Sequence, residues 1–229
     1  MSGVTGWRRI AGVALIAAGA AGCDVSLGID LDNDLDVYGS GRLVTESRGL
    51  PPFHTVSASG VAFVRIDRNG HEGVRITAED NVMRHLEAEV RGGVLYLGVR
   101  RGVSLNLREE IVFEVDAVEL VEVRGSGAID VEAHIGRQDE FWVHLSGASY
   151  LRSFGDVERQ DVDLSGASEY DGLDLGAERT HVVASGASRA WVWAEDRLDA
   201  LASGASEIWF RGDPIVFASE SGGARVRHY

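Results

Sequence analysis

Four serine residues open identical tetrapeptides and are the first candidates for chemistry in this chain. Ser-Gly-Ala-Ser begins at Ser146, Ser165, Ser185 and Ser203. A serine hydroxyl could act as the nucleophile of an acyl-transfer enzyme. A nucleophile is a single residue in its site, however, whereas these serines recur at one position of a repeat, and the chain contains no Gly-x-Ser-x-Gly elbow. We therefore interpret them as structural residues.

Carboxylates beside arginines are the second candidates, because enzymes that cleave polysaccharides use converging carboxylates, often with a basic group or Ca²⁺. The candidates are Asp161, Asp163, Glu169, Asp171 and Asp174, with Arg152 and Arg159 near them in sequence. In the four repeats, the position two before the leading serine is acidic only at Asp163, so no acidic ladder runs along it. We expect these side chains to form a solvated surface.

Metal ligands are the third kind of chemistry to weigh. Asp30, Asp32 and Asp34 have the spacing of the first three ligands of an EF-hand loop. Leu35 stands where the turn glycine belongs and Gly41 where the bidentate glutamate belongs, so we expect a half-exposed strand or a solvated tether instead. The seven histidines show no His-x-x-x-His spacing. The sequence thus predicts no metal, no cofactor and no catalytic residue.

Tryptophans near the repeats suggest a binding platform. Trp191 and Trp193 are two residues apart and should project from one side of a strand. Trp209 follows Ser203 by six residues, as Trp191 follows Ser185. If they face solvent, they stack on adjacent repeats and suit a sugar ring or a partner protein. The alternative is that they pack under a loop or against another copy of the chain.

The charge of the chain excludes one class of partner. Its 229 residues carry a formal net charge of -14, and every basic side chain is an arginine. Binding to a phosphate backbone needs clustered positive charge, so nucleic acid is not an expected partner. A hydrophobic content of 45% suits a soluble globular body.

Residues 1–22 are typical of an export signal. Arg8 and Arg9 precede an uncharged segment that is too short to span a bilayer comfortably. The segment ends at Cys23, the only cysteine, as in the lipobox of a bacterial lipoprotein signal peptide. We expect lipidation of Cys23 and a membrane partner through that anchor. An ordinary secretory signal is the alternative, and the choice between outer and inner membrane stays open.

The period of the repeat predicts the strands and corners that position these residues. The leading serines, including a degenerate copy at Ser126 and one at Ser221, are 18–20 residues apart. Such a period is typical of a solenoid. Apolar residues stand one and three positions before the leading serine of each of the four complete tetrapeptides. This spacing indicates a strand on each side of a glycine-dependent corner. The predicted corners are Ser146-Gly147, Ser165-Gly166, Ser185-Gly186 and Ser203-Gly204.

The half of the chain before the repeats also alternates like strands, with one exception. Asp80 is a suitable N-cap for a short helix from Asn81 to about Val90, because Val82 and Leu86 would lie on one face. Gly92 and Gly93 then turn the chain into another strand.

Four stretches carry a resemblance to a known family. They are Phe53-His54-Thr55-Val56, Val74 to Asn81, Gly93 to Leu97, and the Ser-Gly-Ala-Ser run ending in Ser203 to Pro214. From about Gly39 onward the chain resembles the head GIN domain of bacterial exported proteins. The resemblance implies a right-handed β-helix-like body, a surface or periplasmic location, and an adhesion-like or structural role without catalytic residues.

Together these observations predict an all-β, right-handed β-helix-like solenoid with repeats of 18–20 residues and one short helix. The expected divisions are a lipoprotein signal peptide at 1–22, an acidic tether at 23–38 and the solenoid at 39–229. The expected protein is not an enzyme; it binds glycans or envelope proteins at the cell envelope, facing the periplasm or the cell surface. The alternatives are a carbohydrate-active lyase or hydrolase and a purely structural envelope protein.

Overall fold

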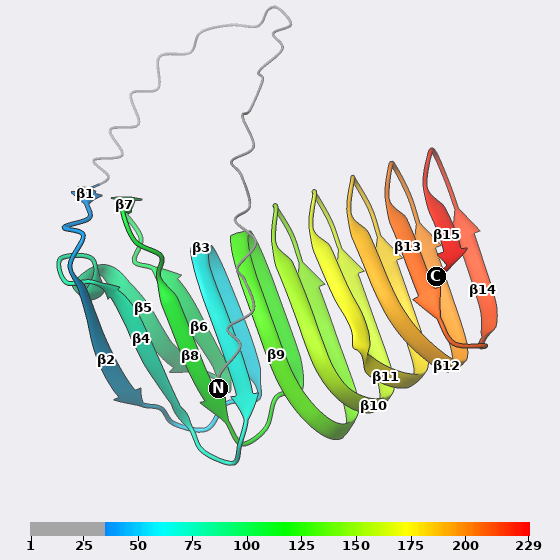
Figure 1. Ribbon diagram of the computed structural model, residues 1–229, viewed down its shortest axis with the longest axis horizontal. Coiled ribbons are helices and arrows are strands. Elements are labelled where there is room, and N and C mark those ends of the chain that lie inside the picture. The colour runs from blue at the N-terminus through cyan, green and yellow to red at the C-terminus, as the bar shows by residue number, and fades with distance from the viewer. Residues whose placement is uncertain (1–34) are drawn as a thin grey trace, which may run out of the picture. The chain divides into compact units, whose positions relative to one another are not determined.

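The computed structural model describes residues 35–229, and the protein in this range is all-β (Figure 1). The predicted signal peptide, Cys23 and the three aspartates at 30, 32 and 34 lie outside the described residues. Leu35–Tyr38, the end of the segment predicted as a tether, forms strand β1 and pairs with β7. Within the described range, no helix is both long and apolar enough to cross a bilayer.

Eight short or bent strands precede the repeats. Their bounds are β1 Leu35–Tyr38, β2 Leu43–Gly49, β3 Thr55–Arg68, β4 Gly73–Glu79, β5 Leu86–Arg91, β6 Val94–Val99, β7 Val103–Asn106 and β8 Val112–Ala117. The main sheet runs from β2 through β4, β8 and β3 to β9. Strand β3 joins the two halves, because it pairs in parallel with both β8 and β9.

Seven strands make up the repeat region. They are β9 Glu122–Leu145, β10 Tyr150–Leu164, β11 Glu169–Ala184, β12 Arg189–Ala202, β13 Glu207–Arg211, β14 Ile215–Glu220 and β15 Arg225–His228. Strands β9 to β12 pair in parallel, each with the next along the chain. Figure 1 shows each of these four strands curving back near its middle. We call the part before the bend the first arm and the part after it the second arm; β13 continues the row of first arms, and β14 that of second arms.

The corners between these strands stack directly on one another. The amide of Ala167 donates a 2.7 Å hydrogen bond to the carbonyl of Gly147, and the equivalent bond recurs at each following corner up to Gly223. Each corner glycine has a φ near +75°, a conformation that L side chains rarely adopt. A Cβ on Gly166 would lie 2.7 Å from the carbonyl oxygen of Gly147. The repeated glycine is therefore required both by its backbone angle and by the close approach of the preceding corner.

The last serine of each corner is buried and satisfies backbone groups. The hydroxyl of Ser206 donates to the carbonyls of Ser203 at 2.8 Å and Ala184 at 3.0 Å. Ser149, Ser168 and Ser188 make the same local bond to the leading serine of their own corner. These hydroxyls donate to carbonyls rather than to one another, and so they hold the corner closed.

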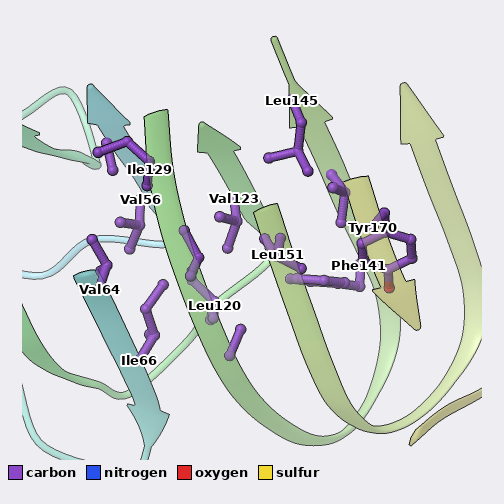
Figure 2. Packing of buried hydrophobic residues seen from close by; sticks show 14 of the residues in the cluster. Val56, Val64, Ile66, Leu120, Val123, Ile129, Phe141, Leu145, Leu151 and Tyr170 are labelled. Atoms are coloured by element: carbon purple, nitrogen blue, oxygen red, sulfur yellow. The ribbon is translucent and has the colours of Figure 1, made fainter. Parts of the chain in front are cut away.

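The core lies between the first and second arms. The apolar pairs predicted before each corner are buried, from Val143 and Leu145 in β9 to Ala200 and Ala202 in β12. Figure 2 shows Leu145, Leu151, Phe141 and Tyr170 directed into this space. Burying a side chain of this size stabilises a fold by about 1.5–3 kcal/mol. The alternation of buried and exposed residues leaves the side chains between them on the outer surface.

One predicted element is wrong. The helix expected from Asn81 to about Val90 is only a 3-10 turn at Met83–His85, and the chain continues as strand β5 from Leu86. The physical reason is the Gly92-Gly93 turn, which folds β5 back onto β6 as an antiparallel pair. Leu86, Ala88 and Val90 then alternate along a strand, and sheet pairing outweighs the weak helical pattern.

Candidate functional site

The three predicted platform tryptophans come together on the outer surface of the first arms. Ala190, Val192 and Ala194 point into the core, so the intervening Trp191 and Trp193 point outward from β12. Trp209 in β13 is the register partner of Trp191. Neighbouring strands lie about 4.8 Å apart, and all three rings are partly exposed.

Arginines from the following strands cover part of these rings. The Arg211 guanidinium lies 4.2 Å from the ring centre of Trp193, and that of Arg227 lies 5.7 Å from the ring centre of Trp209. A cation over an aromatic face holds the ring in place by attraction to its electron-rich surface. Trp193 and Trp209 are therefore oriented in advance, which lowers the entropy cost of binding a ligand.

Charged and hydroxyl-bearing side chains surround the tryptophans. A depression of about 380 Å³ is lined by Glu169, Arg189, Trp191, Glu207, Trp209 and Tyr229. Arg189 and Glu169 form a 2.5 Å ion pair across two strands at its border. A sugar ring has apolar C–H faces and a rim of hydroxyls. Its C–H faces can pack on the flat aromatic surface, and its hydroxyls can form hydrogen bonds with the neighbouring carboxylates and guanidiniums.

Tyr150 extends this surface on the side of β10. Together with Glu169, Asp171, Leu173, Trp191 and Tyr229, it lines a second depression of about 300 Å³. Burial, with the negative charge of Asp171 beside it, raises the pKa of Tyr150 to about 12. Its hydroxyl is therefore protonated at neutral pH and can both donate and accept a hydrogen bond.

The carboxylates considered for catalysis do not converge. Glu169, Asp171 and Asp174 belong to the first half of β11, whereas Asp161 and Asp163 lie on the second arm of β10. Most of them are also neutralised, since Asp174 pairs with Arg152 at 2.5 Å and Asp161 with Arg159 at 2.7 Å. These carboxylates lie on the outer surface, as the sequence predicted.

Sequence reasoning missed another acidic group at the bends of the long strands. Five carboxylates line a depression of about 430 Å³ there: Asp139, Asp156, Glu158, Glu178 and Glu195. Their signal in the sequence was an acid near the middle of every repeat. All five side chains are exposed, whereas a catalytic acid of a glycosidase needs a dry surrounding that keeps it protonated. This arrangement does not favour glycoside hydrolysis.

The fold is similar to those of solved bacterial proteins. The chain superposes on a "putative adhesin" from Bacteroides fragilis with a TM-score of 0.63 and 16% identity, covering 84% of this chain and 100% of the other. A "putative lipid binding protein" from Parabacteroides distasonis gives 0.56 and 17%, covering 85% and 99%. At such identities the likeness concerns the fold alone.

The sequence comparisons identify the family. No curated protein is similar enough to this chain to match it. Residues 52–214 match the family model described as "Putative auto-transporter adhesin, head GIN domain". This range includes β3 to β13, the four Ser-Gly-Ala-Ser corners and all three platform tryptophans. The chain belongs to the head GIN domain family.

Proposed function

We propose that this chain is an exported, lipid-anchored protein of the cell envelope that binds glycans through Trp191, Trp193 and Trp209 without catalysing a reaction. The observation that carries this proposal is the pairing of Trp191 with Trp209 on adjacent strands, with the arginine-covered Trp193 on the same side. The adhesin-like family supports the envelope location and the binding role.

The body that presents this surface is, in our proposal, a right-handed β-helix solenoid. Its support is the parallel pairing of β9 to β12 at offsets of one repeat, together with the stacked corners. In a solenoid each repeat contacts only its neighbours, so equivalent residues form rows on the surface. Rows of this kind suit a long ligand that contacts several repeats at once.

The lipid anchor is proposed at Cys23, and the membrane is the partner that it implies. Acyl chains stabilise membrane attachment by about 0.8 kcal/mol per buried CH₂. Metabolic labelling with a radioactive fatty acid should mark the wild-type chain and not the Cys23→Ser variant. Equal labelling of both, or none of either, would leave the protein with an ordinary secretory signal.

The glycan role is tested with a glycan array and titration calorimetry on the full chain. Replacing Trp191 and Trp209 by alanine together should weaken binding by about tenfold or more, because each aromatic contact contributes about 0.5–1.5 kcal/mol beyond its buried area. Tyr38→Ala is the control, since Tyr38 is an exposed aromatic residue on β1, which belongs to a separate sheet with β7. Equal weakening by the control, or a large loss of thermal stability with unchanged binding, would discard the platform.

Two other functions have weaker support. Lipid binding is suggested by the name of one structural neighbour, but three of the depressions in residues 35–229 are lined largely by charged and aromatic side chains. A carbohydrate-active enzyme would release reducing ends from the polysaccharide that it binds, and we expect no such release. Binding of a glycan without its cleavage would distinguish the proposed role from this alternative. If the chain binds an envelope protein and no glycan, that protein is its partner instead.

A further inference from the structure

A second binding surface lies on the opposite arms of the same strands and contains a row of arginines. Arg159 in β10, Arg179 in β11 and Arg197 in β12 are register partners. Neighbouring strands are about 4.8 Å apart, so three positive charges stand side by side in a line. Like charges directly opposite each other destabilise a sheet, and the chain has an excess of acids that could have occupied these positions.

The outer two arginines of the row are held by their own strands. Arg159 forms a 2.7 Å ion pair with Asp161, and Arg197 forms a 2.6 Å ion pair with Asp199. Each also lies over an aromatic ring, Arg159 over Trp142 and Arg197 over Phe217. The repeated Arg-x-Asp spacing therefore fixes both guanidiniums and neutralises much of their charge.

The central arginine breaks this pattern. Where the flanking strands have aspartate, β11 has His181, which stands in register between Asp161 and Asp199. Across residues 35–229, Arg179 has neither an ion-pair nor a side-chain hydrogen-bond partner, whereas both of its neighbours do. Its side chain is exposed and lines a depression of about 450 Å³ with Thr180 and His181. The five N–H donors of one guanidinium thus remain available at the centre of a rigid row.

We propose that this row, centred on Arg179, binds the carboxylate or sulfate groups of an acidic polysaccharide. A guanidinium binds such planar or tetrahedral anions with two parallel hydrogen bonds. The line of arginines across three strands matches a chain that carries its charges at regular intervals. Each outer guanidinium has five N–H donors, so it can donate both to its own aspartate and to an anion of the ligand. This surface does not depend on the tryptophan platform, because it lies on the second arms instead of the first.

Two other polyanions fit the surface less well. Asp161, Asp163 and Asp199 lie on the same outer face, and a nucleic acid or an anionic bilayer would bring dense phosphate against them. A polysaccharide with one charged group per sugar can place its anions at the arginines and its hydroxyls at the aspartates. The surrounding acids therefore favour a ligand of moderate charge density.

The test uses the full chain with Cys23→Ser, so that no lipid anchor contributes to binding. Polygalacturonate and dextran sulfate are the probes, and uncharged dextran is the control polymer. We expect binding to either polyanion or to both, weakened by added salt, and no binding to dextran. Arg179→Gln should weaken binding by about tenfold or more. Arg225→Gln removes the same charge from an exposed position on β15, beside the first arms, and should change affinity less than twofold.

A second variant keeps Arg179 but gives its guanidinium an ion-pair partner, so that it is no longer free to bind a ligand. His181→Asp restores the Arg-x-Asp spacing of the flanking strands, so Arg179 should form an ion pair and binding should fall by a similar factor. Circular dichroism shows whether each variant is folded, and either variant alone is sufficient for the test. Equal affinity of Arg179→Gln and Arg225→Gln, no binding to either polyanion, or binding only to vesicles containing phosphatidylglycerol would each overturn the proposal.

Discussion

Substitution of a corner glycine measures directly how much the stacked corners contribute to the stability of the protein. Gly166 is the best position, because it has a corner on each side and a φ of +75°. Alanine at this position would place its Cβ 2.7 Å from the carbonyl oxygen of Gly147, closer than real Cβ atoms approach backbone. The same carbonyl accepts the 2.7 Å hydrogen bond from Ala167. The added methyl group would therefore displace the bond that joins the two corners.

The expected cost is the sum of two effects. An alanine with a left-handed backbone costs about 1–2 kcal/mol, and loss of the hydrogen bond between the corners costs about 0.5–1.5 kcal/mol more. Gly166→Ala should therefore lower the free energy of unfolding by about 2–3 kcal/mol. Gly136→Ala has only the first cost, since its φ is +67° and nothing lies within 4 Å of the added Cβ. Gly49→Ala has neither, because its φ is ordinary and its surroundings are open, and it should be neutral or slightly stabilising.

Urea unfolding followed by circular dichroism gives the three free energies, provided that the transition is cooperative in every variant. Hydrogen exchange at the amide of Ala167 supplies an independent measure, because that amide donates the bond between the corners. We expect exchange to accelerate in Gly166→Ala and to stay unchanged in Gly136→Ala. If Gly166→Ala costs no more than Gly136→Ala, the close stacking of the corners contributes nothing and the reasoning fails.

Three further predictions concern single side chains. Tyr170→Phe removes a buried hydroxyl that bonds Ser153 at 2.5 Å and accepts from Gln160, so urea unfolding should show a loss of about 1–3 kcal/mol. Burial, with two nearby glutamates, raises the pKa of Asp130 above its unfolded value. The folded state then holds this proton more tightly than the unfolded state. The free energy of unfolding therefore falls as the pH rises through the unfolded-state and then the folded-state pKa of Asp130. Asp130→Asn should therefore raise Tm at pH 7 and leave it nearly unchanged at pH 3, and an equal shift at both would contradict this cause. Ser206→Ala removes the hydroxyl that closes the last Ser-Gly-Ala-Ser corner and should cost about 0.5–1.5 kcal/mol in the same urea titration.

The sequence indicated the repeats well because their spacing and their small residues are local properties. The alternation at Val162 and Leu164 predicted two buried positions, and both are buried. The interval between corners brought Trp191 and Trp209 into the same row, as expected from their equal distance to the leading serine. Where each repeat has the same length, position in the sequence translates directly into position in space.

The sequence misled where two patterns competed over a short range. Residues 81–90 carry apolar residues at spacings that fit either a helix or a strand, and only pairing with β6 decides between them. The carboxylates at the bends were missed for a different reason. Asp139, Glu158 and Glu178 each precede the next leading serine by seven residues and Glu195 precedes Ser203 by eight, so the row was present in the sequence. It was overlooked because the search for carboxylates concerned the residues next to the corners, whereas the bends bring these acids to one depression.

What the sequence alone determined is therefore the period, the apolar alternation and the corners, because each depends on the conformation of a few consecutive residues. The tertiary structure decided which outward-facing side chains become neighbours and which of them lack a partner. Arg179 illustrates the difference. Arg159, Arg179 and Arg197 each precede a leading serine by six residues, but only the structure shows that, within residues 35–229, Arg179 lacks the ion pair that both of its neighbours form. Register is set by the whole sheet, and a shift of one residue would turn every one of these side chains to the other face.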